Sequence, residues 1–290
     1  MGVLGFFLAF GTAISEALKD IFSKANLLHV DEYTAAFSMH LVISVLLAPI
    51  VVTMGVQEVS TRFLIALLSA SFIQLAVILL YMKAIKRAEL SATVPLVTLT
   101  PLFMLLSSPL LIGEFPSVVG IGGIFLIVAG TYLLNMERNK KGFLAPFKTL
   151  VYSQSSRYML IVAFLWSITA NIDKIGVEET SPIFWAFSKD LLILSYLVPI
   201  VYFKSKAPLQ QLRQRWLSLL GIGIFRTTSV ITQMFAIQYI LVAYVISIKR
   251  SSALLIILYA FFFLQERKNF KTRLMAVVII SLGLLLIALS

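Results

Sequence analysis

Long apolar stretches that contain almost no charge dominate this chain of 290 residues. Only 13% of its residues are charged, 60% are apolar, and the mean hydropathy is +0.97. A soluble domain carries about 25% charged residues, so this chain has too little polar surface to cover a water-soluble globule. A helix of about 20 residues crosses a bilayer, and the length therefore predicts about ten crossings. We expect helices throughout, because lipid-exposed backbone must satisfy its own hydrogen bonds.

The apolar stretches place the ten expected helices between short polar loops. Their predicted ranges are 3–25, 33–54, 62–82, 91–112, 117–136, 158–176, 182–203, 214–236, 242–264 and 272–289. The longest polar stretch falls midway along the chain. We therefore predict a first five-helix half over residues 1–140, a basic linker over 141–157 and a second half over 158–290.

The two halves share short segments at a constant spacing. Ala36-Phe37-Ser38 recurs as Ala186-Phe187-Ser188, and Pro49-Ile50-Val51 recurs as Pro199-Ile200-Val201, each 150 residues later. Because five is an odd number of crossings, the second half enters the membrane from the opposite face. The predicted fold class is an all-α integral membrane protein with ten transmembrane helices in two inverted five-helix repeats.

The distribution of positive charge predicts the orientation. Loops on one face hold 17 Lys and Arg residues, whereas those on the other face hold only Arg62. Basic loops remain cytoplasmic, which puts both termini on the outer side of the membrane. We expect a multi-pass protein of a bacterial or archaeal cell (inner) membrane. We interpret these charges as topology determinants beside anionic lipid, so no nucleic-acid partner is expected. With no cysteine and two histidines, neither thiol chemistry nor a metal site is predicted, and no cofactor is expected.

Several ionisable residues lie within the expected helices. Each costs about 2.5–3.5 kcal/mol near the centre of a span, so these side chains must face the interior. Basic residues exceed acidic ones in the second half, and a surplus of buried positive charge predicts an anionic visitor. The residues are Glu16, Lys19, Asp20, His40, Asp173, Lys174, Lys189, Asp190, Arg226, Lys249 and Arg250.

The candidate substrate-binding residues come from this set. We expect Lys249, Arg250, Lys189 and Arg226 to bind the substrate and Asp173 and Asp190 to set their geometry. The alternative for the acidic residues is pairing that locks the bundle, as between Lys189 and either aspartate. Glu16 and His40 are candidates for proton coupling, against the alternatives of a salt bridge from Glu16 to Lys19 or Arg226 and a simple hydrogen bond from His40.

Other residues indicate packing and anchoring. Gly120, Gly122, Gly123 and Gly130 permit close helix contact, either between the two halves or at a dimer face. Glu114 ends the fourth expected helix, and Glu266 occupies the same place in the second half, 152 residues later. We interpret both glutamates as anchors for neighbouring backbone.

These features together resemble the EamA-like, ten-helix members of the drug/metabolite transporter superfamily, over essentially the whole chain. The second half departs at Ser252-Ala253, where the family pattern has a proline. The residues that carry the resemblance are Tyr81, Ala84, Ser91-Ala92, Thr100-Pro101, Gly113-Glu114, Gly120 and Gly130, followed by Ala236, Glu266 and Gly283.

The resemblance implies a secondary transporter with a central cavity between inverted halves, moving a small metabolite without a bound cofactor. Lys249-Arg250 also resembles the Lys-Arg pair that triose-phosphate translocators of this superfamily use to hold phosphate. Family members are commonly drawn with both termini cytoplasmic, which is opposite to the orientation that the charges favour here.

The function expected from the sequence is alternating-access transport of a small phosphorylated or carboxylated organic anion. The alternative is an exporter of amino acids or drug-like amines, in which Glu16 and Asp190 meet the amine. A channel and an intramembrane enzyme are further alternatives, but no protease, hydrolase or metal motif is present, so we expect no enzyme. The expected partners are a small-molecule substrate and the lipid bilayer, with the chain as a monomer or homodimer.

Overall fold

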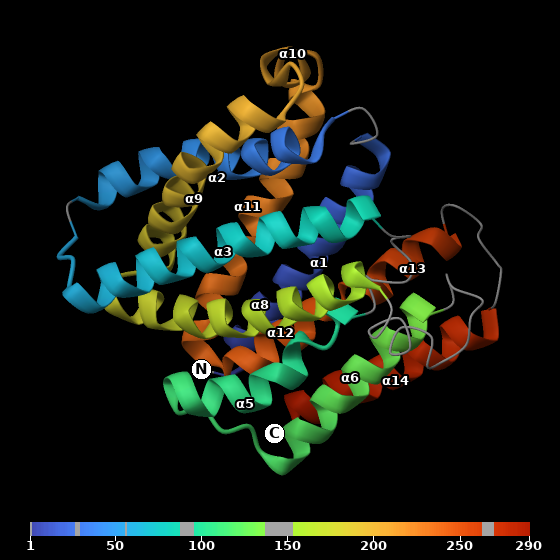
Figure 1. Ribbon diagram of the computed structural model, residues 1–290. Coiled ribbons are helices and arrows are strands. Elements are labelled where there is room, and N and C mark those ends of the chain that lie inside the picture. Colours follow the sequence, from blue (N-terminus) through green and yellow to red (C-terminus); the bar gives the residue numbers. More distant parts are fainter. Residues whose placement is uncertain (1, 27–29, 56, 88–95, 137–152, 263–269) are drawn as a thin grey trace. The chain divides into compact units, whose positions relative to one another are not determined.

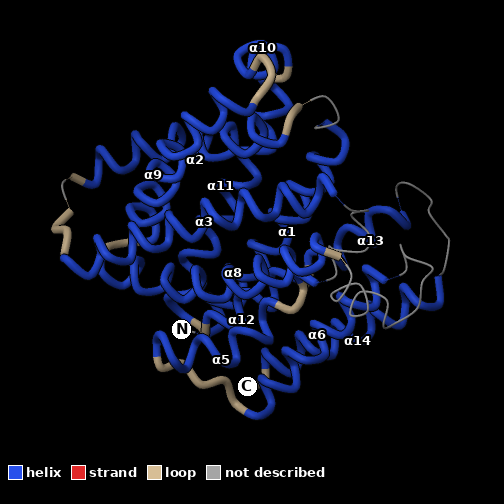
Figure 2. Tube along the Cα trace, in the orientation of Figure 1, coloured by secondary structure: helices blue, strands red, loops and turns tan. Residues whose placement is uncertain are grey.

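The computed structural model describes residues 2–26, 30–55, 57–87, 96–136, 153–262 and 270–290, all of them in helices or short connecting loops (Figures 1 and 2). No strand occurs in these ranges. The helices are α1 Gly2–Asn26, α2 Glu32–Met54, α3 Thr61–Arg87, α5 Thr100–Ile112, α6 Val118–Met136, α8 Gln154–Glu179, α9 Pro182–Lys204, α10 Pro208–Gln214, α11 Trp216–Tyr239, α12 Val242–Arg250, α13 Ser252–Phe262 and α14 Phe270–Ala288.

Helices occupy every expected segment that the structure describes, and the predicted all-α membrane fold is confirmed. Within the described ranges, α1, α2, α3, α8, α9 and α11 are long and apolar enough to cross a membrane, and α5, α6 and α14 contain shorter apolar stretches. Two features differ from the sequence prediction. The short helix α10 was not expected, and the ninth expected helix is interrupted at Ser251, between α12 and α13. The first part of the fourth expected helix lies outside the described residues.

The chain forms two compact units, each of which combines helices from both predicted halves. The first unit contains residues 3–76 and 172–239, and the second contains residues 77–171 and 240–290. The helices α3 and α8 therefore contribute one end to each unit. The domain boundaries proposed from the sequence remain a prediction, and most of the expected linker, residues 141–152, lies outside the described part of the chain.

In the first unit, the repeat-matched helices α2 and α9 pack against each other in opposite directions (Figure 1). Thr34, near the start of α2, hydrogen bonds through its hydroxyl to Ser205, just after the end of α9, at 2.7 Å. His40 and Asp190, which are 150 residues apart, contact each other along the same pair. Two matched residues meet in this way when a local two-fold relation passes between their helices, as an inverted repeat requires.

Asp31 caps the start of α2 and ties it to the end of α9. Its Oδ1 atom accepts hydrogen bonds from the backbone N–H groups of Tyr33 and Thr34, both at 3.0 Å, and its Oδ2 atom accepts one from the Ser205 hydroxyl. Burial raises the pKa of Asp31, but hydrogen bonds from Ser205, Thr34 and Gln211 outweigh this effect and lower the pKa below its ordinary value. The cap is therefore ionised at neutral pH and weakens only as the pH falls through the lowered pKa.

In the second unit, the last helices of the two halves, α6 and α14, approach each other at glycines (Figure 2). A Cβ atom on Gly123 would lie 2.7 Å from the Gly283 carbonyl oxygen, and one on Gly283 would lie 2.8 Å from the Gly123 carbonyl oxygen. Further along α6, a Cβ atom on Gly130 would lie 2.6 Å from Ile280. The glycines thus mediate contact between the halves, as one of the two sequence interpretations predicted.

Glu114 anchors the backbone at the start of α12. Its buried carboxylate accepts a hydrogen bond from the Val242 backbone N–H at 2.8 Å, where the amides of a helix start need an acceptor. The Tyr244 hydroxyl accepts a second hydrogen bond from the Ser117 backbone N–H at 3.1 Å. The anchoring role predicted for Glu114 is confirmed, whereas Glu266 lies outside the described residues.

Adjacent glycines of α6 offer a test of the close packing. Gly123→Ala places a methyl group against the α14 backbone and should destabilise the protein by about 1–3 kcal/mol through overpacking. At Gly122 the nearest atom to a new Cβ is 3.8 Å away, so Gly122→Ala should be neutral or slightly stabilising. Thermal unfolding in detergent measures both variants. Equal effects of the two substitutions would contradict the described contact.

Candidate functional site

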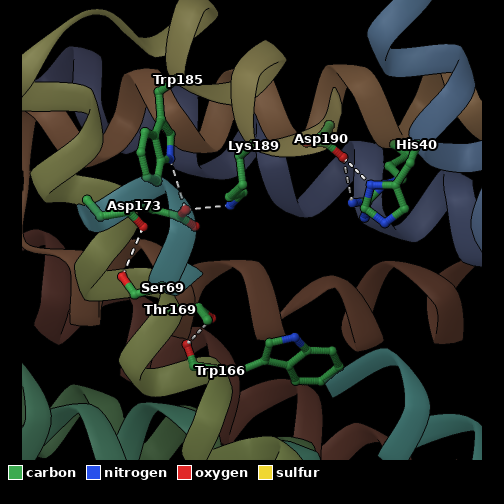
Figure 3. Close-up of polar contacts among 10 residues, drawn as sticks. His40, Ser69, Trp166, Thr169, Asp173, Trp185, Lys189 and Asp190 are labelled. Carbon is green, nitrogen blue, oxygen red and sulfur yellow. Dashed lines mark hydrogen bonds and ion pairs between the residues drawn. The ribbon is translucent and has the colours of Figure 1, made fainter. Parts of the chain in front are cut away.

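A buried cluster of His40, Asp190 and Arg226 lies in the first unit, on α2, α9 and α11; we call it the Asp190 cluster. The His40 Nδ1 atom is 2.5 Å from Asp190 Oδ1 (Figure 3). The Arg226 Nη2 atom is 3.3 Å from the same oxygen. The side chains of His40 and Asp190 are 4% and 1% exposed, whereas that of Arg226 is 24% exposed. A carboxylate deep in the unit thus holds one buried donor and one more accessible donor.

A second cluster surrounds Asp173, near the end of α8. Its Oδ1 atom accepts hydrogen bonds from the Trp185 indole N–H at 2.9 Å and from the Lys189 ammonium group (Figure 3). Trp185 is fully buried, and its ring packs on Gly176, where a Cβ atom would lie only 2.0 Å away. The sequence analysis left open a pairing of Lys189 with either aspartate, and Asp173 is the partner in the structure.

Two polar residues of α1, Thr12 and Glu16, contact α11. Glu16 forms a salt bridge with Lys19 at 2.5 Å and accepts a hydrogen bond from the Ser229 hydroxyl at 2.9 Å. One turn earlier, the hydroxyls of Thr12 and Thr232 lie 2.9 Å apart. The ion pair with Lys19 is the alternative that the sequence analysis set against a proton-carrying role for Glu16.

Three basic residues of the first unit each contact a carboxylate. They belong to the surplus of positive charge that the sequence predicted. Lys189 contacts Asp173, Arg226 contacts Asp190, and Lys174 lies 3.9 Å from Glu178. The expected surplus of positive charge is therefore not found for these three residues. Pairing offsets the cost of desolvating both partners, which explains why the charges occur together.

In the second unit, Arg250 lies at the end of α12, next to Lys249. Its Nη2 atom is 3.3 Å from the Thr100 hydroxyl, which itself donates to the Val97 carbonyl at 2.7 Å. The guanidinium group lies over the Trp166 ring, 5.1 Å from its centroid, in a cation–π arrangement. Both basic residues are half-buried. Two contacts from different helices thus orient the planar group of Arg250.

The helix interruption after Arg250 recurs at the matched place in the first half. Helix α13 begins at Ser252 and α5 begins at Thr100, 152 residues earlier, which is also the spacing of Glu114 and Glu266. Short turns at Ser251 and at residues 98–99 precede these two starts. Broken helices of this kind place backbone dipoles and side chains at the binding sites of secondary transporters.

The six predicted substrate-binding residues are divided between the units. Lys189, Arg226, Asp173 and Asp190 belong to the first unit, in two clusters, and Lys249 and Arg250 belong to the second. The structure thus brings Asp173 together with Lys189, and Asp190 together with Arg226 and His40. Their convergence on one chamber remains a prediction.

Sequence reasoning missed three residues that build these sites. Trp185 precedes Lys189 by one helical turn, a spacing that places both on one face and was a usable signal. Gly176 makes room for the Trp185 ring, and Trp166 supports Arg250. Neither of these two residues belongs to a motif in the sequence, because each acts by packing against a partner that is distant along the chain.

The fold and these intramembrane charges define a multi-pass α-helical membrane protein, and comparisons with known proteins give its family. The EamA-like transporter family model matches residues 3–136 and again 156–289. The chain belongs to the EamA-like transporter family and is a membrane transporter of the drug/metabolite type. The family recognition from sequence is thereby confirmed, including its two-repeat architecture.

Solved structures share the fold. One crystal structure of another protein matches with a TM-score of 0.76 at 15% identity, covering 100% of this chain and 98% of the other. At this identity, the similarity shows a common architecture alone. A comparison with curated protein sequences finds no match.

Two arginine–carboxylate pairs of similar length test the importance of burial. Arg226→Ala leaves the Asp190 carboxylate without one of its charged partners and should destabilise the protein by about 3 kcal/mol. Arg62 lies 3.2 Å from Glu179 but is 67% exposed, so Arg62→Ala should cost less than about 1 kcal/mol. Thermal unfolding in detergent compares the two. A loss for Arg226→Ala no larger than that for Arg62→Ala would contradict a buried ion pair.

Proposed function

We propose that this transporter moves a small phosphorylated or carboxylated organic anion by alternating access. The observation that carries the proposal is the position of Arg250 at a helix interruption, where its guanidinium group lies over the Trp166 ring and within 3.3 Å of the Thr100 hydroxyl. A planar guanidinium group held in one orientation suits two-point binding of a carboxylate or phosphate. Lys249 adds a second positive charge at the same helix end.

Helix α5, which contacts Arg250 of α12, also supports anion binding. It begins at Thr100, the residue that touches Arg250. The start of a helix carries partial positive charge, which favours a nearby anion. The guanidinium group and the helix start therefore act in the same direction.

The first unit supplies the second proposed set of ligands. We assign Lys189 and Arg226 to anion binding, with Asp173 and Asp190 holding the two basic side chains in place before substrate arrives. Each contact leaves further donors on the basic group, since an ammonium group has three N–H donors and a guanidinium group has five. The carboxylates in this proposal position the basic side chains and do not themselves touch the anion.

One observation favours export of amino acids or drug-like amines as the second candidate function. The Asp190 Oδ2 atom is buried and accepts no hydrogen bond within the described part of the chain. An ammonium group of a substrate is a suitable donor for such an oxygen. In this alternative, Asp190 and Glu16 would meet the amine.

Transport by the purified protein in liposomes distinguishes the two candidates. Radiolabelled glycerol 3-phosphate, phosphoenolpyruvate, malate, lysine and phenylalanine form the panel, each assayed for uptake and for counterflow against the same unlabelled compound. We expect saturable counterflow of at least one anion and of neither amino acid. Movement of the amino acids without any anion would refute the anion proposal, and non-saturable uptake would favour a channel.

Substitution of Arg250 tests the binding site itself. Arg250→Ala should reduce anion counterflow at least about a hundredfold, since a charge-assisted bidentate contact is lost, with little loss of folded protein. Arg250→Lys keeps the charge but not the two-point geometry and should recover only part of the activity. Lys206→Ala removes an exposed charge beyond α9 and serves as the control with normal transport. Normal counterflow by Arg250→Ala would assign the arginine a structural role.

Cellular placement completes the proposal. We propose a bacterial or archaeal cell (inner) membrane. The strong charge difference between the two loop sets supports placing the basic loops in the cytoplasm. The protein acts in this proposal as a monomer or homodimer.

A further inference from the structure

The Asp190 cluster combines one tight contact and one loose contact on a single oxygen atom. His40 Nδ1 is 2.5 Å from Asp190 Oδ1, while Arg226 Nη2 reaches the same atom at 3.3 Å, near the long limit for a hydrogen bond. An ionised carboxylate only accepts, so His40 Nδ1 carries the proton of this bond and Nε2 is the nitrogen that can gain another. The imidazole is thus the firm partner of Asp190 and the guanidinium group the weaker one.

Arg226 contacts Asp190 through a single nitrogen atom. It uses one nitrogen on one oxygen, in place of the paired contacts that make arginine–carboxylate bridges strong. Its Nε atom has no hydrogen-bond partner in the described part of the chain. Its side chain is 24% exposed, whereas Asp190 and His40 are almost fully buried. Arg226 is therefore the most exposed member of the cluster and the one that we expect an anion to meet.

The charged neighbours of the cluster come from all the helices packed around it. Asp190 and Lys189 of α9 and Arg226 of α11 act electrostatically on His40. Lys19 of α1, which pairs with Glu16 and Asp20 of the same helix, also acts electrostatically on Arg226. Helix α10 also contacts α2, but its charged residue, Arg213, is exposed.

We propose that the Asp190 cluster couples anion transport to a proton, with Arg226 moving from Asp190 to the substrate and a proton on His40 replacing it beside the carboxylate. This inference rests on the proposed anion transport. Before substrate binds, Asp190 and Arg226 cancel and His40 is neutral. With a monoanionic group on Arg226, the imidazolium cancels Asp190, so the cluster is again neutral. One proton is taken up from the side that supplies the anion and is released with it on the other side.

His40 suits this role better than Glu16, the other candidate for proton coupling. Glu16 contacts Lys19 at 2.5 Å and Ser229 at 2.9 Å, and neither contact involves a residue assigned to substrate binding. His40 shares its acceptor atom with Arg226, a proposed ligand. Anion binding to Arg226 would therefore remove a competing charge from the carboxylate that holds His40.

The experiment uses liposomes that contain purified protein and the pH indicator pyranine, with valinomycin and equal potassium on both sides to remove the membrane voltage. Each anion of the panel above is added outside, and uptake of label is measured together with internal pH. We expect the wild type to acidify the interior as the anion enters. In His40→Gln, anion-driven acidification should fall at least about tenfold. His29→Gln, which removes the other histidine of the chain, should acidify like the wild type.

The outcomes test proton coupling and anion transport separately. Anion uptake without internal acidification by the wild type, or acidification unchanged in His40→Gln, overturns proton coupling and leaves anion transport standing. No uptake of any panel anion by the wild type refutes the proposed function and the coupling that rests on it. If His40→Gln does not fold, Asp190→Asn replaces it, because loss of the carboxylate removes the same proton-holding pair. Protein-free liposomes correct for passive entry of acid.

Discussion

The cost of placing charge inside a bilayer governs the structure of this transporter. A charge at the centre of a span costs about 2.5–3.5 kcal/mol, and it is tolerated when a partner on another helix compensates it. In the first unit, Asp173 with Lys189 and Asp190 with Arg226 satisfy this requirement. The pairs also set how the helices pack, because α9 contributes one member to each pair. Binding chemistry and helix packing in this unit thus depend on the same few side chains.

The second unit relies on close backbone contact between helices. Gly123 and Gly283 let α6 and α14 approach until carbonyl oxygens limit the distance. Glu114 accepts a hydrogen bond from a backbone N–H group at the start of α12. These fixed contacts hold the helices that carry the interruption at Arg250. A rigid frame around a broken helix is what a geometrically specific anion site needs, since ordering the site in advance reduces the cost of binding.

Much of the fold is readable from the sequence, because hydrophobic length is a local property. Apolar stretches located the helices to within a few residues, and the spacing of 150 revealed the repeat. Helix α10 escaped prediction because its seven residues, Pro208–Gln214, are mostly polar and carry no membrane signal. The interruption at Ser251 escaped because no proline or glycine marks it. The site was harder to predict from the sequence. Its charged residues could be identified, but the partner of each, such as Trp185 for Asp173, depends on three-dimensional packing. His40 and Asp190 occupy matched repeat positions, 150 residues apart, but their contact was likewise not predicted.

The reciprocal glycine contact between α6 and α14 has a consequence for biosynthesis. Helix α6 is the last helix of the first half and leaves the ribosome long before α14, the final helix of the chain. Its glycine face then meets lipid, which gives it no backbone to pack against. Insertion of the first half alone therefore cannot complete the second unit. The glycine face of α6 lacks its partner helix until α14 is made. A chain without α14 would leave Gly123 and Gly130 without the helix that they contact in the complete protein.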